Sequence, residues 1–222
     1  MALESVIFGT NADLIKAVGD LYIRPGEIVV DPTYGKGTWW GKTDLSRFRL
    51  LKSDLRATLK EERHDARNLP HEDESAHKCV LDLPYIHKAG THLTEEQYNH
   101  ETTNGKDHDG ILRLQQDCIV ELYRIVKPGG QIWVKCKDEI QYWTHIELYE
   151  FATGLGLYLK DTAILVSTSK ICSARWKNQF HLRKTHSFLL IFEKTDKPKR
   201  SRSRSAHSNL PGSKGFDAIS PK

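Results

Sequence analysis

Three aspartates each follow a short strand-like stretch, and the first of them opens a loop with two glycines. Asp31 ends the stretch EIVVD, and Gly35 and Gly37 follow within six residues. Asp54 and Asp82 take the same place in RFRLLKSD and KCVLDLPY. Because glycine has no Cβ atom, a ligand can lie directly against its main chain, which can also adopt positive φ. Acids and bare main chain at strand ends indicate a ligand-binding loop, although an ordinary strand-to-helix turn has the same glycine pattern.

The residues of this loop do not match two common nucleotide-binding patterns. The signature D-P-x-Y-G-x-G-T lacks the final Gly-Lys-Ser/Thr of a phosphate loop, and Trp40 replaces the last glycine of a dinucleotide motif. Asp54 lies 23 residues after Asp31, close to the roughly 20-residue offset of an acid that binds ribose hydroxyls. Asp65 could accept a hydrogen bond from an exocyclic amine, but the acidic run 61–74 fits a solvated surface equally well.

Strand-like and helix-like stretches alternate through residues 1–194 and predict the elements that position these side chains. The apolar patterns predict helices over 11–23, 112–126 and 145–157, and strands over 27–31, 47–54, 78–85, 131–136, 161–168 and 186–194. In the first helix, one face carries Leu14, Ala17, Val18 and Leu21. The second helix is closed by Pro128-Gly129-Gly130.

This alternation predicts an α/β fold with a mainly parallel sheet and helices on both faces. In such a sheet, ligands bind at the carboxyl ends of the strands. The last two predicted strands have no helix between them, so we expect an antiparallel hairpin at the sheet edge. All three strand-end aspartates then lie on the edge formed by the carboxyl ends of the strands, where a ligand would bind.

Composition indicates a soluble domain, residues 1–194, followed by a basic tail, residues 195–222. Hydrophobic residues make up 38% and charged residues 28% of the chain, and no apolar run approaches the roughly 20 residues of a membrane helix. The net charge of +4 comes from the tail, which is rich in Ser, Pro, Gly and Lys/Arg and is expected to be disordered. The four scattered cysteines contain no CxxC pair, which argues against a zinc site or disulfide framework. We expect a cytoplasmic protein, nucleoid-associated if its source is bacterial or a phage.

Several motifs, in this order, resemble those of the DNA methyltransferases that methylate amines of adenine N6 or cytosine N4. VVDPTYGKGT is similar to the loop that cradles S-adenosylmethionine in that family, LDLPY to its D-P-P-Y motif, and DARNLP to the preceding segment. IFGTNADLIKAV resembles its N-terminal motif. The resemblance covers residues 6–194 and implies a Rossmann-like class I methyltransferase with a seven-stranded sheet. It implies that the cofactor is S-adenosylmethionine and that no metal is needed. The residues implied to bind the cofactor are Thr10, Asn11, Asp31, Thr33, Tyr34, Gly35, Gly37, Thr38, Asp54 and Asp65.

The segment Asp82-Leu83-Pro84-Tyr85 carries the catalytic residues that this resemblance implies. An exocyclic amine is a weak nucleophile, because its lone pair is delocalised into the ring; acceptors for its two N–H groups would stabilise the transition state. The Asp82 carboxylate and the Pro84 carbonyl suit that role, and Tyr85 offers a ring on which a flipped base can stack. A strand that ends in a proline turn, with Tyr85 in the core, is the alternative. The chain departs from the family in Leu83, which replaces the first proline, and in having no room for a separate target-recognition domain.

A basic segment is the candidate nucleic-acid contact. Within residues 167–186 there is no acid, and cations alternate with aromatic residues. Such cations neutralise phosphates while rings stack on bases, although a solvated hairpin connection fits equally well. The predicted nucleic-acid contacts are Lys170, Arg175, Trp176, Lys177, Arg183 and Lys184. The loop 86–110 follows the catalytic motif directly, and we expect it to act as a lid over the target base.

These residues predict an S-adenosylmethionine-dependent DNA methyltransferase with adenine N6 as its acceptor. The leading acid of the DLPY segment favours adenine over cytosine, since serine leads the cytosine motif in the family it resembles. Two alternatives stay open. One is the same chemistry on RNA or on a protein amide, and the other is a catalytically idle subunit that binds nucleic acid or a partner.

Overall fold

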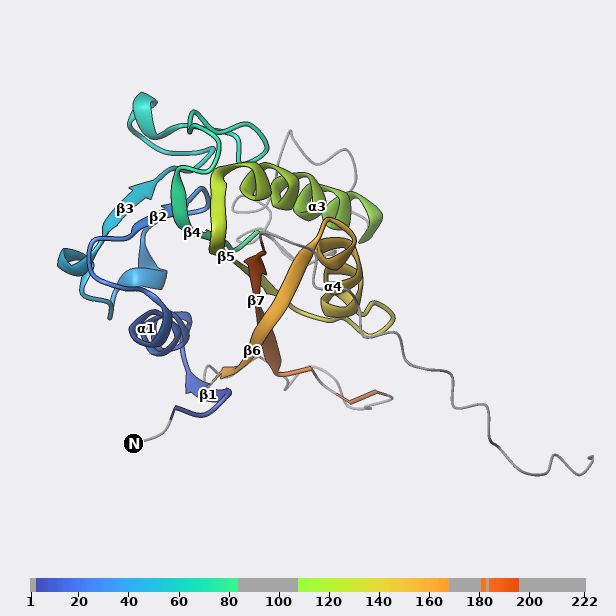
Figure 1. Ribbon diagram of the computed structural model, residues 1–222. Coiled ribbons are helices and arrows are strands. Elements are labelled where there is room, and N and C mark those ends of the chain that lie inside the picture. Colours follow the sequence, from blue (N-terminus) through green and yellow to red (C-terminus); the bar gives the residue numbers. More distant parts are fainter. Residues whose placement is uncertain (1–2, 84–107, 168–180, 183, 196–222) are drawn as a thin grey trace, which may run out of the picture.

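The computed structural model describes residues 3–83, 108–167, 181–182 and 184–195 (Figure 1). Its elements are β1 Val6–Gly9, α1 Asn11–Tyr22, β2 Ile28–Asp31, η1 Thr38–Trp40, η2 Leu45–Arg47, β3 Arg49–Lys52, η3 Lys60–Glu62, β4 Ala76–Leu81, α3 His108–Ile125, β5 Val126–Cys136, α4 Thr144–Gly154, β6 Leu157–Ser167 and β7 His186–Lys194. The strands form one seven-stranded sheet in the order β1-β6-β7-β5-β4-β2-β3. Strand β7 runs antiparallel to β5 and β6, and the other pairs are parallel. The predicted sheet, with its antiparallel C-terminal hairpin, is confirmed.

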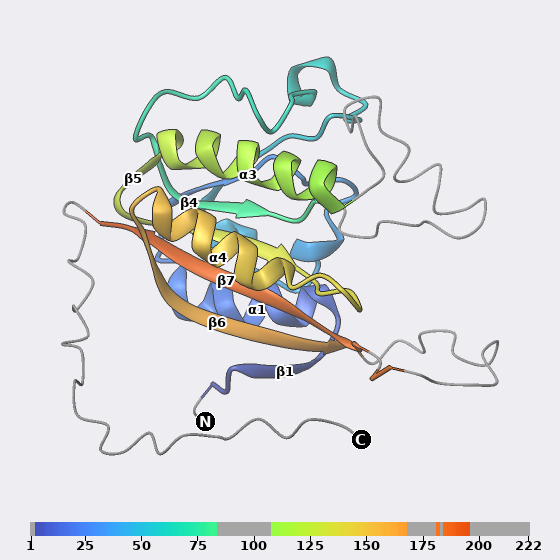
Figure 2. The same ribbon diagram turned by 90° about the vertical axis from the view of Figure 1, so that its right-hand side faces the viewer.

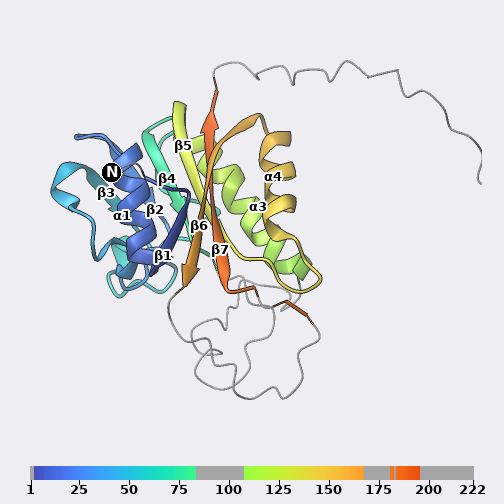
Figure 3. The ribbon, with the colours of Figure 1, turned by 90° about the horizontal axis from the view of Figure 1, so that it is seen from below.

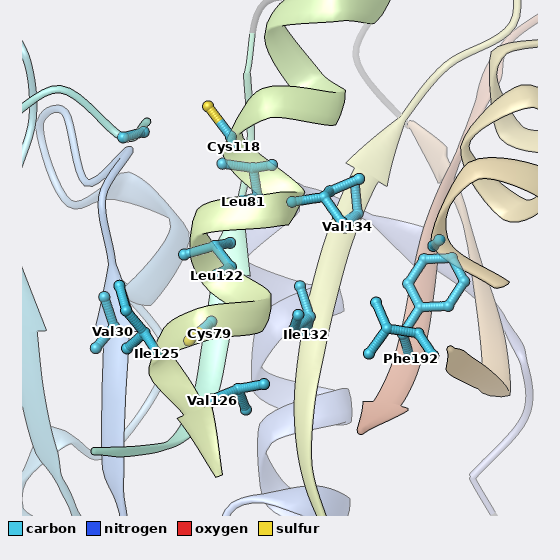
Figure 4. Close-up of a cluster of buried hydrophobic side chains, with 14 of the residues drawn as sticks. Val30, Cys79, Leu81, Cys118, Leu122, Ile125, Val126, Ile132, Val134 and Phe192 are labelled. Carbon is cyan, nitrogen blue, oxygen red and sulfur yellow. The ribbon is translucent and has the colours of Figure 1, made fainter. Parts of the chain in front are cut away.

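Helices cover both faces of the sheet, as predicted. Helix α1 lies on one face, whereas α3 and α4 lie on the other (Figures 2 and 3). Under α3, a buried cluster joins strand residues to the helix, among them Val30, Leu81, Leu122 and Ile132 (Figure 4). A second cluster lies on the α1 face and includes Trp39 and Trp40. The sheet is therefore buried on both sides, as parallel sheets require.

Helix α1 begins at a capping box and buries one face. The side chain of Thr10 accepts a hydrogen bond from the Asp13 amide, and Asp13 accepts one from the Thr10 amide in return. Leu14 and Val18 are buried as the sequence predicted. Leu21, predicted on the same face, is 57% exposed, and Ile15 is buried instead. The buried face of α1 thus includes Ile15 and leaves out Leu21. Which side chains are buried depends on how the helix packs on the sheet, and an ideal helical period predicts this only approximately.

Two further details differ from the sequence-based expectation, and a third was not predicted. The hairpin is not at the sheet edge, because β1 pairs with β6 outside it. Strand β5 begins at Val126, so Pro128-Gly129-Gly130 lie inside it, at a register irregularity between its pairs with Ala76 and Lys78. The connections from β2 to β3 and from β3 to β4 contain only 3-10 turns. Within the described ranges, no helix has the length and apolar character needed to cross a membrane.

Candidate active site

The three strand-end aspartates lie on adjacent strands at one edge of the sheet. Asp31 is the last residue of β2, Asp82 directly follows β4, and Asp54 comes two residues after β3. Since β4, β2 and β3 are neighbouring parallel strands, their carboxyl ends meet at the same edge. The prediction that these acids converge on one edge is confirmed.

Asp31 is enclosed by its own loop. Its Oδ1 atom accepts hydrogen bonds from the Thr33 amide at 2.9 Å and the Thr33 hydroxyl at 3.1 Å, and its Oδ2 atom accepts one from the Trp40 indole at 2.7 Å. Burial, together with the smaller effect of the Asp82 charge, raises the pKa of Asp31 to about 6, against the opposing effect of these donors. Both oxygens of Asp31 are hydrogen-bonded, and only 2% of its surface is exposed. Asp31 therefore stabilises the conformation of the loop by binding Thr33 and Trp40.

The glycine loop presents bare main chain beside Asp54. Gly35 is exposed and has φ +52, and a Cβ built on it would be in ordinary contact with Asp54 Oδ2 at 3.9 Å and the Thr33 carbonyl oxygen at 4.0 Å. Its amide donates to Asp54 Oδ2 at 3.0 Å, while Asp54 Oδ1 accepts from the Arg56 amide at 2.8 Å. At Gly37, with φ +70, a Cβ would lie 2.5 Å from the Tyr34 hydroxyl. Gly37 is therefore needed for the loop to close on Tyr34, whereas Gly35 is favoured by its positive φ and presents exposed main chain.

The N-terminus of α1 is tied to the end of this loop. Lys42, just after η1, forms an ion pair with Asp13 at 2.6 Å. Asp13 is the partner of the N-cap residue Thr10 in the capping box of α1. Asn11 begins the helix, and Thr38 begins η1. The two segments whose motifs resemble cofactor-binding segments are thus neighbours in the structure.

Asp82 is held at its main chain and at its carboxylate. Its amide donates to the Thr33 hydroxyl at 3.0 Å. Lys135, on β5 and only 2% exposed in its side chain, donates to Asp82 Oδ1 at 3.3 Å. Burial raises the pKa of Asp82, whereas Lys135 lowers it, and so does the nearby indole N–H of Trp39. The side chain of Asp82 is still 22% exposed, so this carboxylate can meet a ligand.

Lys135 was not recognised as a site residue from the sequence. Its ammonium also lies 5.7 Å from the ring centre of Trp39. The signal was present in the predicted strand QIWVKC, where a lysine interrupts an otherwise apolar run. A charge inside a strand that is buried on both faces needs a partner, but the sequence does not say which.

The other predicted residues fall in two groups. Asp65 forms a two-point ion pair with Arg67, with contacts of 2.6 to 3.2 Å, and this pairing lowers its pKa. Lys184 lies 3.8 Å from Asp138 and 3.7 Å from the ring centre of Trp143. The remaining residues lie outside the described part of the chain: Pro84, Tyr85, Lys170, Arg175, Trp176, Lys177 and Arg183. Most of the predicted lid, 86–110, and of the tail also lie outside it.

The described residues fit an organic cofactor at the glycine loop. The main chain of Gly35 is exposed, and the partly exposed Asp54 carboxylate next to it has lone pairs for hydroxyl donors. Within the described ranges, no three His, Cys, Asp or Glu residues are grouped as metal ligands would be.

Several solved structures described as methyltransferases have the same fold. A putative methyltransferase from Bacillus halodurans is 13% identical, with a TM-score of 0.54 over 83% of this chain and 99% of its own. The 1,6-didemethyltoxoflavin-N1-methyltransferase of Burkholderia thailandensis, solved with S-adenosylhomocysteine, is 12% identical, with a TM-score of 0.53 over 84% and 79%. A SAM-dependent methyltransferase from Methanosarcina mazei is 10% identical, with a TM-score of 0.50 over 80% and 97%. At these identities the likeness establishes the fold.

Sequence comparison identifies the family. No curated protein sequence matches this chain. The family pattern described as DNA methylase, of the N6/N4 type, matches residues 76–215, which is more than half of the chain. The match begins at the first residue of β4 and contains Asp82 and Lys135, while the glycine loop precedes it. By this match, and by the methyltransferase fold that carries it, the chain belongs to the N6/N4 DNA methylase family.

Proposed function

We propose that this protein transfers a methyl group from S-adenosylmethionine to an exocyclic amine of a DNA base, with adenine N6 as the acceptor. The observation that carries the proposal is the placement of Asp82. In a chain of the DNA methylase family, its partly exposed carboxylate lies at the same sheet edge as the exposed main chain at Gly35. The proposed sites for the methyl donor and for the amine are thus at the ends of neighbouring strands.

The glycine loop is the proposed cofactor site. When bound, S-adenosylmethionine supplies an electrophilic methyl group on a positively charged sulfur. The main chain at Gly35 accommodates it, and Asp54 accepts hydrogen bonds from the ribose hydroxyls. Asp31 contributes indirectly, because its oxygens already hold Thr33 and Trp40. The other residues proposed to line the site are Thr10, Asn11, Tyr34, Gly37, Thr38 and Asp65.

Asp82 is the proposed acceptor for the amine N–H. A carboxylate oxygen that accepts this hydrogen bond draws electron density onto the nitrogen and stabilises the positive charge that develops there as the methyl group arrives. Lys135 opposes the effect of burial on the pKa of Asp82 and so favours the ionised form, which is the form that accepts. The methylated nitrogen then sheds one proton, and the Asp82 oxygen can receive it and release it to water. We propose that the Pro84 carbonyl takes the second N–H and that the ring of Tyr85 stacks on the base.

The choice of DNA and of adenine rests on the family and on Asp82. The family match supports DNA, and the acid in the first place of the DLPY segment favours adenine. Methylation of RNA or of a protein amide uses the same donor site and is the nearest alternative. A catalytically idle subunit would have no need of a buried lysine beside the acid, since an unused ion pair at a partly exposed edge adds little stability.

A methyl-transfer assay tests the proposal. The full chain is incubated with tritiated S-adenosylmethionine and, separately, duplex DNA, RNA and a protein mixture. We expect label in DNA, recovered as N6-methyl-2′-deoxyadenosine after digestion. Label in N4-methylcytosine, in RNA or in protein would redirect the substrate assignment. Cofactor binding without transfer to any substrate would support the idle-subunit alternative.

A further inference from the structure

The hydroxyl of Thr33 joins the glycine loop to the catalytic segment. It donates to Asp31 Oδ1 at 3.1 Å and accepts from the Asp82 amide at 3.0 Å, across 49 residues of sequence. We propose that Thr33 is a positioning residue that fixes the main chain of Asp82 to the glycine loop, rather than a ligand of the cofactor. This inference rests on the proposed function of Asp82 as the acceptor for the amine.

The direction of these hydrogen bonds is set by the groups involved. A hydroxyl has one proton to donate and two lone pairs, whereas an ionised carboxylate only accepts and an amide N–H only donates. The Thr33 proton must therefore point at Asp31, which leaves a lone pair for the Asp82 amide. Because the acceptor at the end of this chain is charged, both bonds are strengthened. Asp31 is itself fixed from the other side by the Trp40 indole at 2.7 Å, so the whole chain of bonds is anchored in the core.

Asp82 needs this attachment because it lies beyond the sheet ladders. The paired positions of β2 and β4 end at Val30 and Cys79, and those of β4 and β5 end at Leu81 and Val134. The Thr33 hydroxyl, on the β2 side, thus accepts the hydrogen bond of the Asp82 amide where the ladder no longer offers a main-chain acceptor. From the β5 side, Lys135 holds the carboxylate. Fixing both the main chain and the side chain of Asp82 determines where its free oxygen points.

The two roles open to Thr33 predict different losses. A cofactor ligand would lower cofactor affinity when removed. A positioning residue would leave that affinity intact and lower turnover, because a displacement of about 1 Å at a catalytic group costs on the order of 10²-fold. In the structure the hydroxyl proton and one lone pair are already committed to Asp31 and Asp82, which favours the second role.

The first experiment compares Thr33→Val, which keeps the shape and removes the hydroxyl, with Thr33→Ser, which keeps the hydroxyl. For Thr33→Val we expect kcat to fall by about 10- to 100-fold, with the Kd for S-adenosylhomocysteine within about threefold of wild type. Thr33→Ser should recover most of the turnover. A Thr33→Val variant that binds S-adenosylhomocysteine tenfold more weakly, yet turns over normally once saturated, would make Thr33 a cofactor ligand and overturn the inference.

The second experiment does not depend on activity. Amide hydrogen exchange, followed by NMR, should be slow at Asp82 in the wild type and in Thr33→Ser. It should be at least tenfold faster in Thr33→Val, while the amide of Val80 in the middle of β4 keeps its wild-type rate and shows that the variant is folded. Equal exchange at Asp82 in wild type and Thr33→Val would refute the inference. If the wild type methylates no substrate, the proposed function fails, and the exchange rates still decide the role of Thr33.

Discussion

Two aspartates at the ends of neighbouring parallel strands have opposite surroundings. Asp31, at the end of β2, is 2% exposed and has donors on both oxygens. Asp82, after β4, has a side chain 22% exposed, with Lys135 on Oδ1. Burial raises the pKa of both acids. Equivalent positions in the sheet therefore do not imply equivalent roles, because the number of oxygens left for a ligand depends on which donors reach each acid.

The donors to the two acids also come from different distances along the chain. Asp31 is bound by residues two and nine positions ahead of it, Thr33 and Trp40. Asp82 is bound by Thr33 and Lys135, which lie 49 and 53 positions away. The first acid is thus enclosed by local sequence, and the second is placed by the order of the strands. We therefore propose a structural role for Asp31 and a catalytic role for Asp82.

The sharpest test of this contrast is the change Asp82→Ala. Loss of the acceptor should lower kcat by about 10²- to 10³-fold, while the Kd for S-adenosylhomocysteine, measured by calorimetry, stays near that of wild type. Asp82→Asn, with the same shape and no charge, is the matched variant and should also be strongly impaired. Turnover close to wild type in Asp82→Ala would remove Asp82 from the catalytic assignment.

The next test separates backbone strain from ligand contact at the glycine loop. Gly35 and Gly26 both have positive φ, and a Cβ at either position would clash with no atom, so alanine at either site should cost about 1–2 kcal/mol of stability. Only Gly35→Ala should also weaken S-adenosylhomocysteine binding, by roughly tenfold, since about 1.4 kcal/mol corresponds to a factor of ten. Calorimetry and thermal unfolding of both variants check this. Equal affinities would place the cofactor elsewhere.

A third test concerns the ionisation of Asp82. Lys135 lowers the pKa of Asp82, so Lys135→Met should raise it and move the acidic limb of the kcat profile towards higher pH. Turnover should then recover partly in alkaline buffer. The matched control is Lys78→Met, which removes another buried lysine, paired with Glu27 just before β2, and should lose stability without moving the limb. An unshifted limb in Lys135→Met would show that Lys135 does not control Asp82.

The smallest expected effect is the pH dependence of stability that comes from Asp31. Its pKa is raised from 3.8 to about 6 in the folded protein, so the folded state takes up this proton before the unfolded chain does. The resulting stabilisation is complete below about pH 3.8 and is lost as pH rises through about 6.

Asp31→Asn cannot titrate, so urea unfolding between pH 4 and 7 should show a flatter pH dependence than wild type in this window. Asp44→Asn is the control of opposite sign. Hydrogen bonds from Ser46 lower the pKa of Asp44, so its contribution is lost as pH falls rather than as pH rises. A variant at Asp31 with the wild-type pH profile would contradict the raised pKa.

The sequence by itself determined the three α-helices and every strand of the sheet except β1, together with the acids at the strand ends and the glycine loop. These features depend on short-range patterns: apolar periodicity for α1, α3 and α4, and the absence of Cβ atoms at Gly35 and Gly37. The order of the motifs gave the family, which the match over residues 76–215 confirms. Periodicity wrongly predicted that Leu21 is buried, because the buried face of a helix is set by its packing against the sheet.

Only the tertiary structure decided the strand order and the partners that depend on it. Nothing local indicates that β1 pairs outside β6, so the hairpin was wrongly predicted at the sheet edge. In the same way, no pattern near Lys135 or Thr33 points to Asp82, because these residues become neighbours only when β5, β4 and β2 lie side by side. A side-chain hydrogen bond acts over about 3 Å, and that distance is set by register and packing, not by sequence separation.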